Sequence, residues 1–180
     1  MTPSARPSRR LTAAALSAAP ALAAPLPAAS QSLDDAVRAN LGLALRLCLR
    51  TAADVPATVA AFQAAGFTYT PAAEANGDVW HRFFGPANTV RAEILQGQMA
   101  PSCDVHTNHR PPSEAAPLVR AILNQAAPGR FVPIPAGPDS CAIFSEAADA
   151  IPLMVTVGAT DLSAGCPALG STVLSIFFAV

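Results

Sequence analysis

Lysine is missing from this sequence, and charged residues of both signs are scarce. All 11 basic residues are arginine, and charged residues make up 13% of the 180 positions. The arginines are scattered along the chain rather than gathered in one stretch. Binding to nucleic acid or to an anionic membrane surface depends on clustered cations that neutralise phosphates. The composition therefore predicts a protein without a nucleic-acid partner.

The chain also lacks an apolar run of the roughly 20 residues that a membrane-spanning helix needs. Residues 1–23 have the pattern of a signal peptide: arginines, then an Ala/Leu-rich segment at residues 11–22, then a small-x-small site ending at Ala23. We expect cleavage near Ala23, export to the periplasm or the medium, and no stable membrane insertion. Arg9-Arg10 leaves twin-arginine export open, although the residues that follow favour general secretion. Cleavage would leave 8 arginines and 12 acidic residues, a net charge of −4.

Three short motifs that mark catalytic or cofactor sites are missing as well. The sequence has no Gly-rich phosphate loop, no G-x-S-x-G nucleophile turn and no C-x-x-C redox pair. We therefore predict no cofactor and no catalytic residue. An enzyme is less expected than a binding protein, although a triad is recognised by its geometry and not by its order in the sequence.

The four cysteines are far apart in the sequence. In an exported chain, four cysteines are typical of two disulfides, and three pairings are possible. We favour Cys48–Cys103 with Cys141–Cys166, because this pairing ties each half of the chain locally. The other two pairings stay open at this point.

Hydrophobic periodicity predicts the helices. Residues 24–31 have no periodicity and are expected to form a disordered mature N-terminus. Ser32 is a suitable N-cap for a first helix, and Asp54 for a second one that ends at Gly66. Ser113 is the expected cap of a third helix, which ends before Pro128.

Alternation of apolar and polar residues predicts the strands. Residues 79–84 and 89–95 form a hairpin around a Gly-Pro-Ala-Asn turn, and a third strand follows at 103–107. Further short strands lie at 130–135 and in the last 40 residues. The order indicates a single α+β domain over residues 32–180. It contains two N-terminal helices and a mostly antiparallel sheet of five to seven strands, with the third helix between its two halves.

The histidines and aromatic residues supply two candidate sites. Trp80, Arg82, Arg91 and His106 are expected to form a ligand or partner patch, in a groove between the sheet and its helices, because Trp and Arg dominate binding surfaces. A metal or hydrolytic centre at His81, His106 and His109 is the alternative, since imidazoles at short spacing suit zinc or copper. We predict no metal as the first reading, because Cys103 and His106, three residues apart on the expected strand, point to opposite faces, and Cys103 is expected to form a disulfide.

Two carboxylates of the same region have a simpler interpretation. Glu93 and Asp104 are predicted to lie on adjacent strands, as part of a solvated face.

The chain resembles, as a class, the small disulfide-linked exported α+β proteins of bacteria, and no motif is specific enough to name a family. We expect a non-catalytic protein that binds a protein partner or a small ligand. The alternative is a metal-dependent or hydrolytic enzyme centred on the three histidines.

Overall fold

The computed structural model describes residues 32–51, 54–97, 102–147, 152–161, 166–167 and 169–178. These belong to one compact unit, Gln31–Val180. The predicted signal peptide and the predicted N-terminal segment 24–31 lie outside the described residues. In chain order the elements are α1 (Leu33–Thr51), α2 (Val55–Ala64), β1 (Thr68–Ala73), β2 (Val79–Phe84), the 3-10 turn η1 (Pro86–Asn88), β3 (Arg91–Gln96), β4 (Cys103–Thr107), α3 (Pro112–Ala126), β5 (Phe131–Ile134), β6 (Ala142–Glu146), β7 (Leu153–Ala159) and β8 (Thr172–Phe178).

The helix ends follow from local chemistry. Ser32 Oγ accepts a hydrogen bond from the backbone N–H of Asp35 at 3.1 Å, and the Asp54 carboxylate accepts one from the N–H of Ala57 at 2.9 Å. Gly66 follows α2 with a positive φ of 85°, and the rings of Phe62 and Phe67 meet edge to face across it, 5.0 Å apart. These predictions are confirmed.

The third helix differs slightly from its prediction. It begins at Pro112, one residue before the expected Ser113 cap, and no side chain caps it. Proline fits the first turn of a helix because its missing N–H would have no intrahelical acceptor there.

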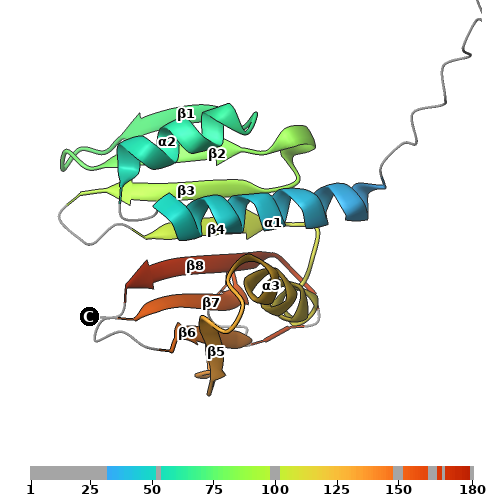
Figure 1. Ribbon diagram of the computed structural model, residues 1–180. Coiled ribbons are helices and arrows are strands. Elements are labelled where there is room, and N and C mark those ends of the chain that lie inside the picture. Colours follow the sequence, from blue (N-terminus) through green and yellow to red (C-terminus); the bar gives the residue numbers. More distant parts are fainter. Residues whose placement is uncertain are drawn as a thin grey trace, which may run out of the picture. The chain divides into compact units, whose positions relative to one another are not determined.

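All eight described strands form one antiparallel sheet in the order β1-β2-β3-β4-β8-β7-β6-β5 (Figure 1). The α+β class and the mostly antiparallel sheet are confirmed, but the prediction of five to seven strands is slightly low. The additional strand is β1, which runs through Pro71 to Ala73 and pairs with β2 along its whole length. Pro71 is tolerated because β1 is an edge strand, where a missing N–H breaks no ladder.

The sheet consists of two similar halves. Each half is a helical segment followed by a four-strand antiparallel meander: α1 and α2 with β1–β4, then α3 with β5–β8. The last strands of the two halves, β4 and β8, pair antiparallel, with Val105 opposite Leu174. The two halves therefore share one strand topology, a repeat that is not visible in the sequence.

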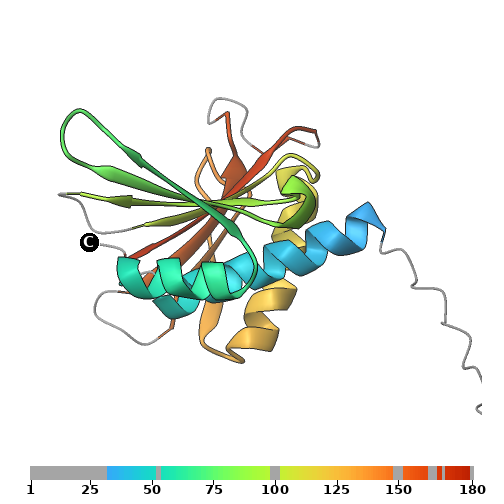
Figure 2. The same cartoon turned by 90° about the horizontal axis from the view of Figure 1, so that it is seen from above.

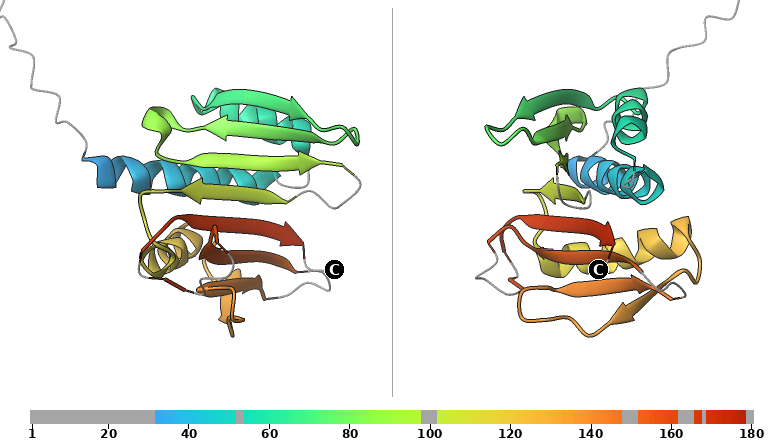
Figure 3. Two further views of the ribbon diagram at one scale, coloured as in Figure 1. Left: turned by 180° about the vertical axis from the view of Figure 1, so that it is seen from behind. Right: turned by 90° about the vertical axis from the view of Figure 1, so that its left-hand side faces the viewer.

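The three helices cover the same face of the sheet (Figures 2 and 3). Strand residues alternate accordingly, because successive side chains point to opposite faces. On β3 and β4 the buried residues are Ala92, Ile94, Cys103 and Val105, and they face the helices. The other face is left without a helix among the described residues, and we call it the open face. No helix in the described part of the chain is long and apolar enough to cross a membrane.

Two disulfides reinforce the fold, and both match the favoured pairing. Cys48–Cys103 links α1 to β4, and both of its residues are fully buried. Cys141–Cys166 joins the residue before β6 to the segment between β7 and β8, and Cys166 is exposed. The first bridge therefore fixes the helical layer onto the middle of the sheet.

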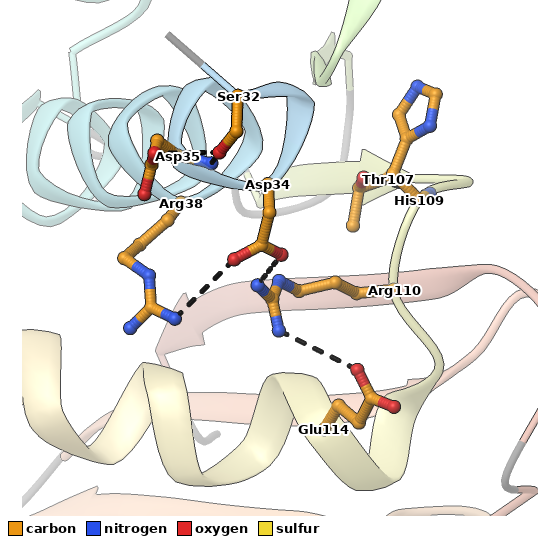
Figure 4. Close-up of polar contacts among 8 residues, drawn as sticks. All are labelled: Ser32, Asp34, Asp35, Arg38, Thr107, His109, Arg110 and Glu114. Carbon is orange, nitrogen blue, oxygen red and sulfur yellow. Dashed lines mark hydrogen bonds and ion pairs between the residues drawn. The ribbon is translucent and has the colours of Figure 1, made fainter.

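Arg110 connects the two halves near the N-termini of α1 and α3 (Figure 4). Only 9% of this residue is exposed. Its guanidinium pairs with Asp34 of α1 and lies 3.6 Å from the carboxylate of Glu114 on α3. Its backbone carbonyl accepts a hydrogen bond of 2.7 Å from the hydroxyl of Thr172 on β8. One residue thus contacts both helices and the central strand.

We predict that loss of Cys48–Cys103 destabilises the protein more than loss of Cys141–Cys166. The bridges span 55 and 25 residues, and chain entropy alone assigns them about 4 and about 3.5 kcal/mol. The buried position of Cys48 and Cys103 adds a packing cost when they are truncated. Urea unfolding of the two Cys→Ala double variants measures the difference, and an equal or reversed order would contradict it.

A second prediction concerns Arg110. Replacement by alanine should lower the free energy of unfolding by about 1–3 kcal/mol, because a mostly buried cation and its apolar stem are removed together. Arg38→Ala is the matched control. Arg38 also contacts Asp34, at 3.7 Å, but its side chain is 57% exposed, so its loss should cost no more than about 0.5 kcal/mol. Similar losses in both variants would show that Arg110 is an ordinary surface cation.

Candidate functional site

The four residues of the predicted patch lie together on the open face. Trp80 and Arg82 share one side of β2, whereas His81 and Phe83 point toward the helices. Cross-strand register places Arg91 opposite both Phe84 and His106. The four residues therefore share one face of the sheet, and their role as a ligand or partner patch stays a prediction. The expected location in a groove between sheet and helices is wrong. Successive side chains of β2 point to opposite faces, and Trp80 and Arg82 lie on the face away from the helices.

Glu93 is the centre of the polar contacts on the open face. Its side chain is only 12% exposed, and three basic groups surround its carboxylate. Arg82 Nε lies 3.0 Å and Arg91 Nε 3.3 Å from Oε1, and His106 Nε2 lies 3.3 Å from Oε2. Three donors around one mostly buried carboxylate define an ionic network rather than a set of independent surface charges.

Asp104 extends this network by one strand. It lies directly opposite Glu93 on one side and Ser175 on the other. Burial raises the pKa of Asp104 above its ordinary value of 3.8, Glu93 raises it further, and a hydrogen bond with Ser175 and the charge of His106 oppose the rise. Two carboxylates in register repel one another, so the cations around Glu93 are needed to hold the pair on one face.

The ionisation of His106 is set by the same neighbours. Burial lowers the pKa of His106 below its ordinary value of 6.5, and the positive charge of Arg91 lowers it further. Glu93 and Asp104 act in the opposite direction. The Nδ1 atom of His106 is buried and has no hydrogen-bond partner among the described residues.

A pocket of about 290 Å³ adjoins Arg91 and His106 at one end of the open face. The η1 turn forms one wall of it, and Ala87 and Asn88 of this turn have positive φ angles of 55° and 53°. Non-glycine residues adopt this conformation at some cost, so the turn is held by its surroundings. The pocket is lined by Phe84, Asn88, Thr89, Val90, Arg91, His106, Thr107, Asn108 and Thr160.

The three histidines of the alternative site do not come together. His81 is buried on the helix side, where its Nδ1 lies 2.9 Å from the hydroxyl of Tyr69 and its Nε2 lies 2.9 Å from Oε1 of Gln96. His106 lies on the open face, and His109 follows the end of β4 with an exposed side chain that points away from Arg110 (Figure 4). Within the described ranges, no group of three His, Cys, Asp or Glu side chains is arranged to hold a metal ion.

The network has no arrangement for nucleophilic catalysis among the residues described. A hydrolytic triad needs a hydroxyl bonded to the histidine, but the serine of this cluster, Ser175, bonds Asp104, and Nε2 of His106 faces Glu93. The groups of the network bond one another.

Glu93 is the member of this network that the sequence interpretation did not assign to the patch. Its adjacency to Asp104 was predicted correctly, but the prediction of a solvated face was wrong, since Glu93 is mostly buried. The hairpin register, which places Arg82 opposite Glu93, is the signal that indicates this pair. Ser175 and Thr160 come from the last third of the chain, and only the β4–β8 pairing brings that part to the cluster.

Comparison with known proteins adds no relative: no family model, no curated protein and no solved structure matches this chain.

We predict opposite effects of two substitutions on the pKa of His106. Arg91→Gln should raise it, because a repelling cation is removed, and Glu93→Gln should lower it, because an attracting anion is removed. A titration of the His106 ring followed by NMR measures both, with Arg38→Gln as a distant control. Shifts of the same sign in both variants would contradict the network.

The same pKa predicts a pH dependence of stability. The folded protein binds fewer protons at His106 than the unfolded chain does just below pH 6.5, because folding lowers this pKa. The free energy of unfolding should therefore fall as the pH drops from 6.5 through the folded-state pKa. His106→Gln should remove this part of the dependence in urea unfolding measured over that range. An unchanged slope in the variant would assign the effect to another group.

Proposed function

We propose that this protein is an exported, non-catalytic binding protein whose open face docks a partner protein. The observation that supports the proposal is that the helices cover one face of an eight-stranded sheet (Figure 2). The other face presents aromatic and charged residues. Two disulfides support export, because such bonds persist in oxidising compartments. The signal-peptide pattern of residues 1–23, with cleavage near Ala23, supports the same route to the periplasm or the medium.

The extent of the open face favours a protein over a small ligand. Eight strands about 4.8 Å apart and about 20 Å long give a face of about 700 Å². A standard protein interface buries about 800 Å² on each partner. The pocket beside His106 occupies one end of this face and is of a size to receive a side chain from the partner.

The chemistry of the open face indicates what a partner presents. Half-buried apolar side chains lie on both sides of the row that holds Arg82, Glu93 and Asp104. The side chains of Arg82 and Arg91 remain 37% and 45% exposed, although both contact Glu93. A complementary surface would place carboxylates against these two arginines, with apolar side chains beside them. The flanking apolar residues are Trp80, Phe84, Leu95, Met154, Val173 and Phe177.

The alternative of an enzyme centred on His81, His106 and His109 is not supported by a geometric observation. Two of these residues lie on opposite faces of the sheet, and the third lies beyond the end of β4.

We predict that a benzophenone amino acid at position 80 cross-links a specific partner protein in the exported fraction. The same amino acid at position 120, exposed on α3, is the matched control and should not capture that protein. The captured partner is then purified and titrated against the unmodified chain. Arg82→Glu should weaken this binding at least about tenfold, because Trp and Arg at the centre of an interface carry most of its energy.

Arg120→Glu should change the affinity less than about twofold, since surface charges outside an interface contribute little. The proposal fails if the purified partner binds wild type and Arg82→Glu equally. It also fails if only a small molecule, detected through the emission of Trp80, the one tryptophan of the chain, occupies the open face.

A further inference from the structure

The helical layer contains a second concave surface, on the side of the sheet opposite the proposed docking face. A cleft of about 220 Å³ lies where the C-terminal ends of α1 and α3 meet the start of β5. The two helices contact one another, and α3 lies below α1 in both panels of Figure 3. The walls of the cleft are mostly apolar, but three arginines rim it. It is lined by Leu43, Arg46, Leu49, Arg50, Ala126, Ala127, Arg130 and Phe131.

The three arginines of this cleft have few anionic partners. Arg130 Nε bonds Glu146 at 2.5 Å, and its guanidinium lies over the ring of Phe131, 5.5 Å from the centroid. Neither Arg46 nor Arg50 forms an ion pair with a carboxylate of the described residues. In a chain with more carboxylates than arginines, this is a local excess of positive charge.

Arg46 is the most informative of the three. It is half-buried, and its guanidinium lies back over the surface of α1. A Cβ atom at Gly42 would lie 3.5 Å from Arg46 Nη1 and 3.5 Å from Ile122 Cδ1 of α3. The absence of a side chain at Gly42 therefore provides the space in which the guanidinium and α3 approach the backbone of α1.

A second cleft continues from the first along the α1–α3 boundary and shares Arg46 with it. It has a volume of about 450 Å³, is more open, and is lined by Arg38, Ala39, Gly42, Arg46, Leu118, Ala121, Ile122 and Gln125. Arg46 thus lies between two hollows whose walls are largely apolar.

We propose that the α1–α3 cleft binds a small anionic amphiphile, a monocarboxylate with a short unbranched alkyl chain. The carboxylate pairs with Arg46 and Arg50 in the geometry that guanidinium groups favour, and the alkyl chain covers Leu43, Leu49 and Phe131. The volume of about 220 Å³ is below the roughly 300–1,000 Å³ of typical ligand pockets. The site therefore suits a molecule smaller than a typical drug.

Purely structural roles account for only part of this arrangement. A cation in the last turn of α1 stabilises the helix dipole, which explains Arg50. The ion pair with Glu146 accounts for the position of the Arg130 Nε atom. An arginine stem that covers apolar surface normally extends its head into water, and Nη1 of Arg46 lies 3.5 Å from the position that a Gly42 Cβ would take, on the α1–α3 boundary that both clefts share. A bound carboxylate supplies the anion that Arg46 lacks.

The test is a titration of the full mature chain with octanoate, 1-octanol and octylammonium, followed by NMR of the methyl groups. Octanoate should bind saturably with a dissociation constant of about 1 mM or tighter. The shifts should be centred on Leu43, Leu49 and Ala127. The alcohol and the amine share the alkyl chain and lack the negative charge, so they should bind at least about tenfold more weakly.

Arg46→Gln should weaken octanoate binding about tenfold, and Arg120→Gln, the same change on α3 outside the cleft, should alter it less than about twofold. The proposal is overturned if the three compounds bind wild type equally, if Arg46→Gln binds octanoate normally, or if no saturation occurs by about 10 mM. The comparison of ligands uses wild type alone, so a poorly folded variant does not leave the question open. The cleft and the open face are separate surfaces, and each proposal can fail without the other.

Discussion

The antiparallel pairing of β4 with β8 is the interaction on which the rest of the structure depends. Each half of the described chain is a helical segment and a four-strand meander with one apolar face. Alone, each meander would expose the edge of its last strand, and an exposed edge invites pairing with other chains. Joining these two edges makes one sheet, buries Val105 and Leu174 beneath the helices, and brings Ser175 beside Asp104 on the other face.

Covering only one face divides the chemistry of the protein between its two sides. On the open face, Glu93 gathers three basic groups, so the charges there are paired and their side chains are held in place. In the helical layer, Arg46 and Arg50 have no carboxylate beside them in the described structure, and they adjoin apolar clefts. Paired charges suit recognition of a surface by shape and register, whereas unpaired cations near apolar walls suit an anionic ligand.

The features that were predicted correctly are those that depend on neighbours in the sequence. The caps at Ser32 and Asp54 need only the next turn of chain. The favoured disulfide pairing rested on loop length within each half of the chain, and the structure has that pairing. The prediction failed on the number of strands and on the location of the patch. Both errors concern pairing and packing that the local pattern does not show. β1 continues through Pro71 as an edge strand paired with β2, and helices cover the side opposite Trp80 and Arg82.

By itself, the sequence determined which residues share a face. Alternation along β2, β3 and β4 puts Trp80, Arg82, Arg91 and His106 on one side and His81 on the other, because a strand reverses its side chains at every residue. Only the tertiary structure decided which of these faces the helices cover, and that Glu93 is buried among cations. Those outcomes depend on the summed packing of segments far apart in the chain, such as Asp34 with Arg110, 76 residues apart, and no local pattern encodes that sum.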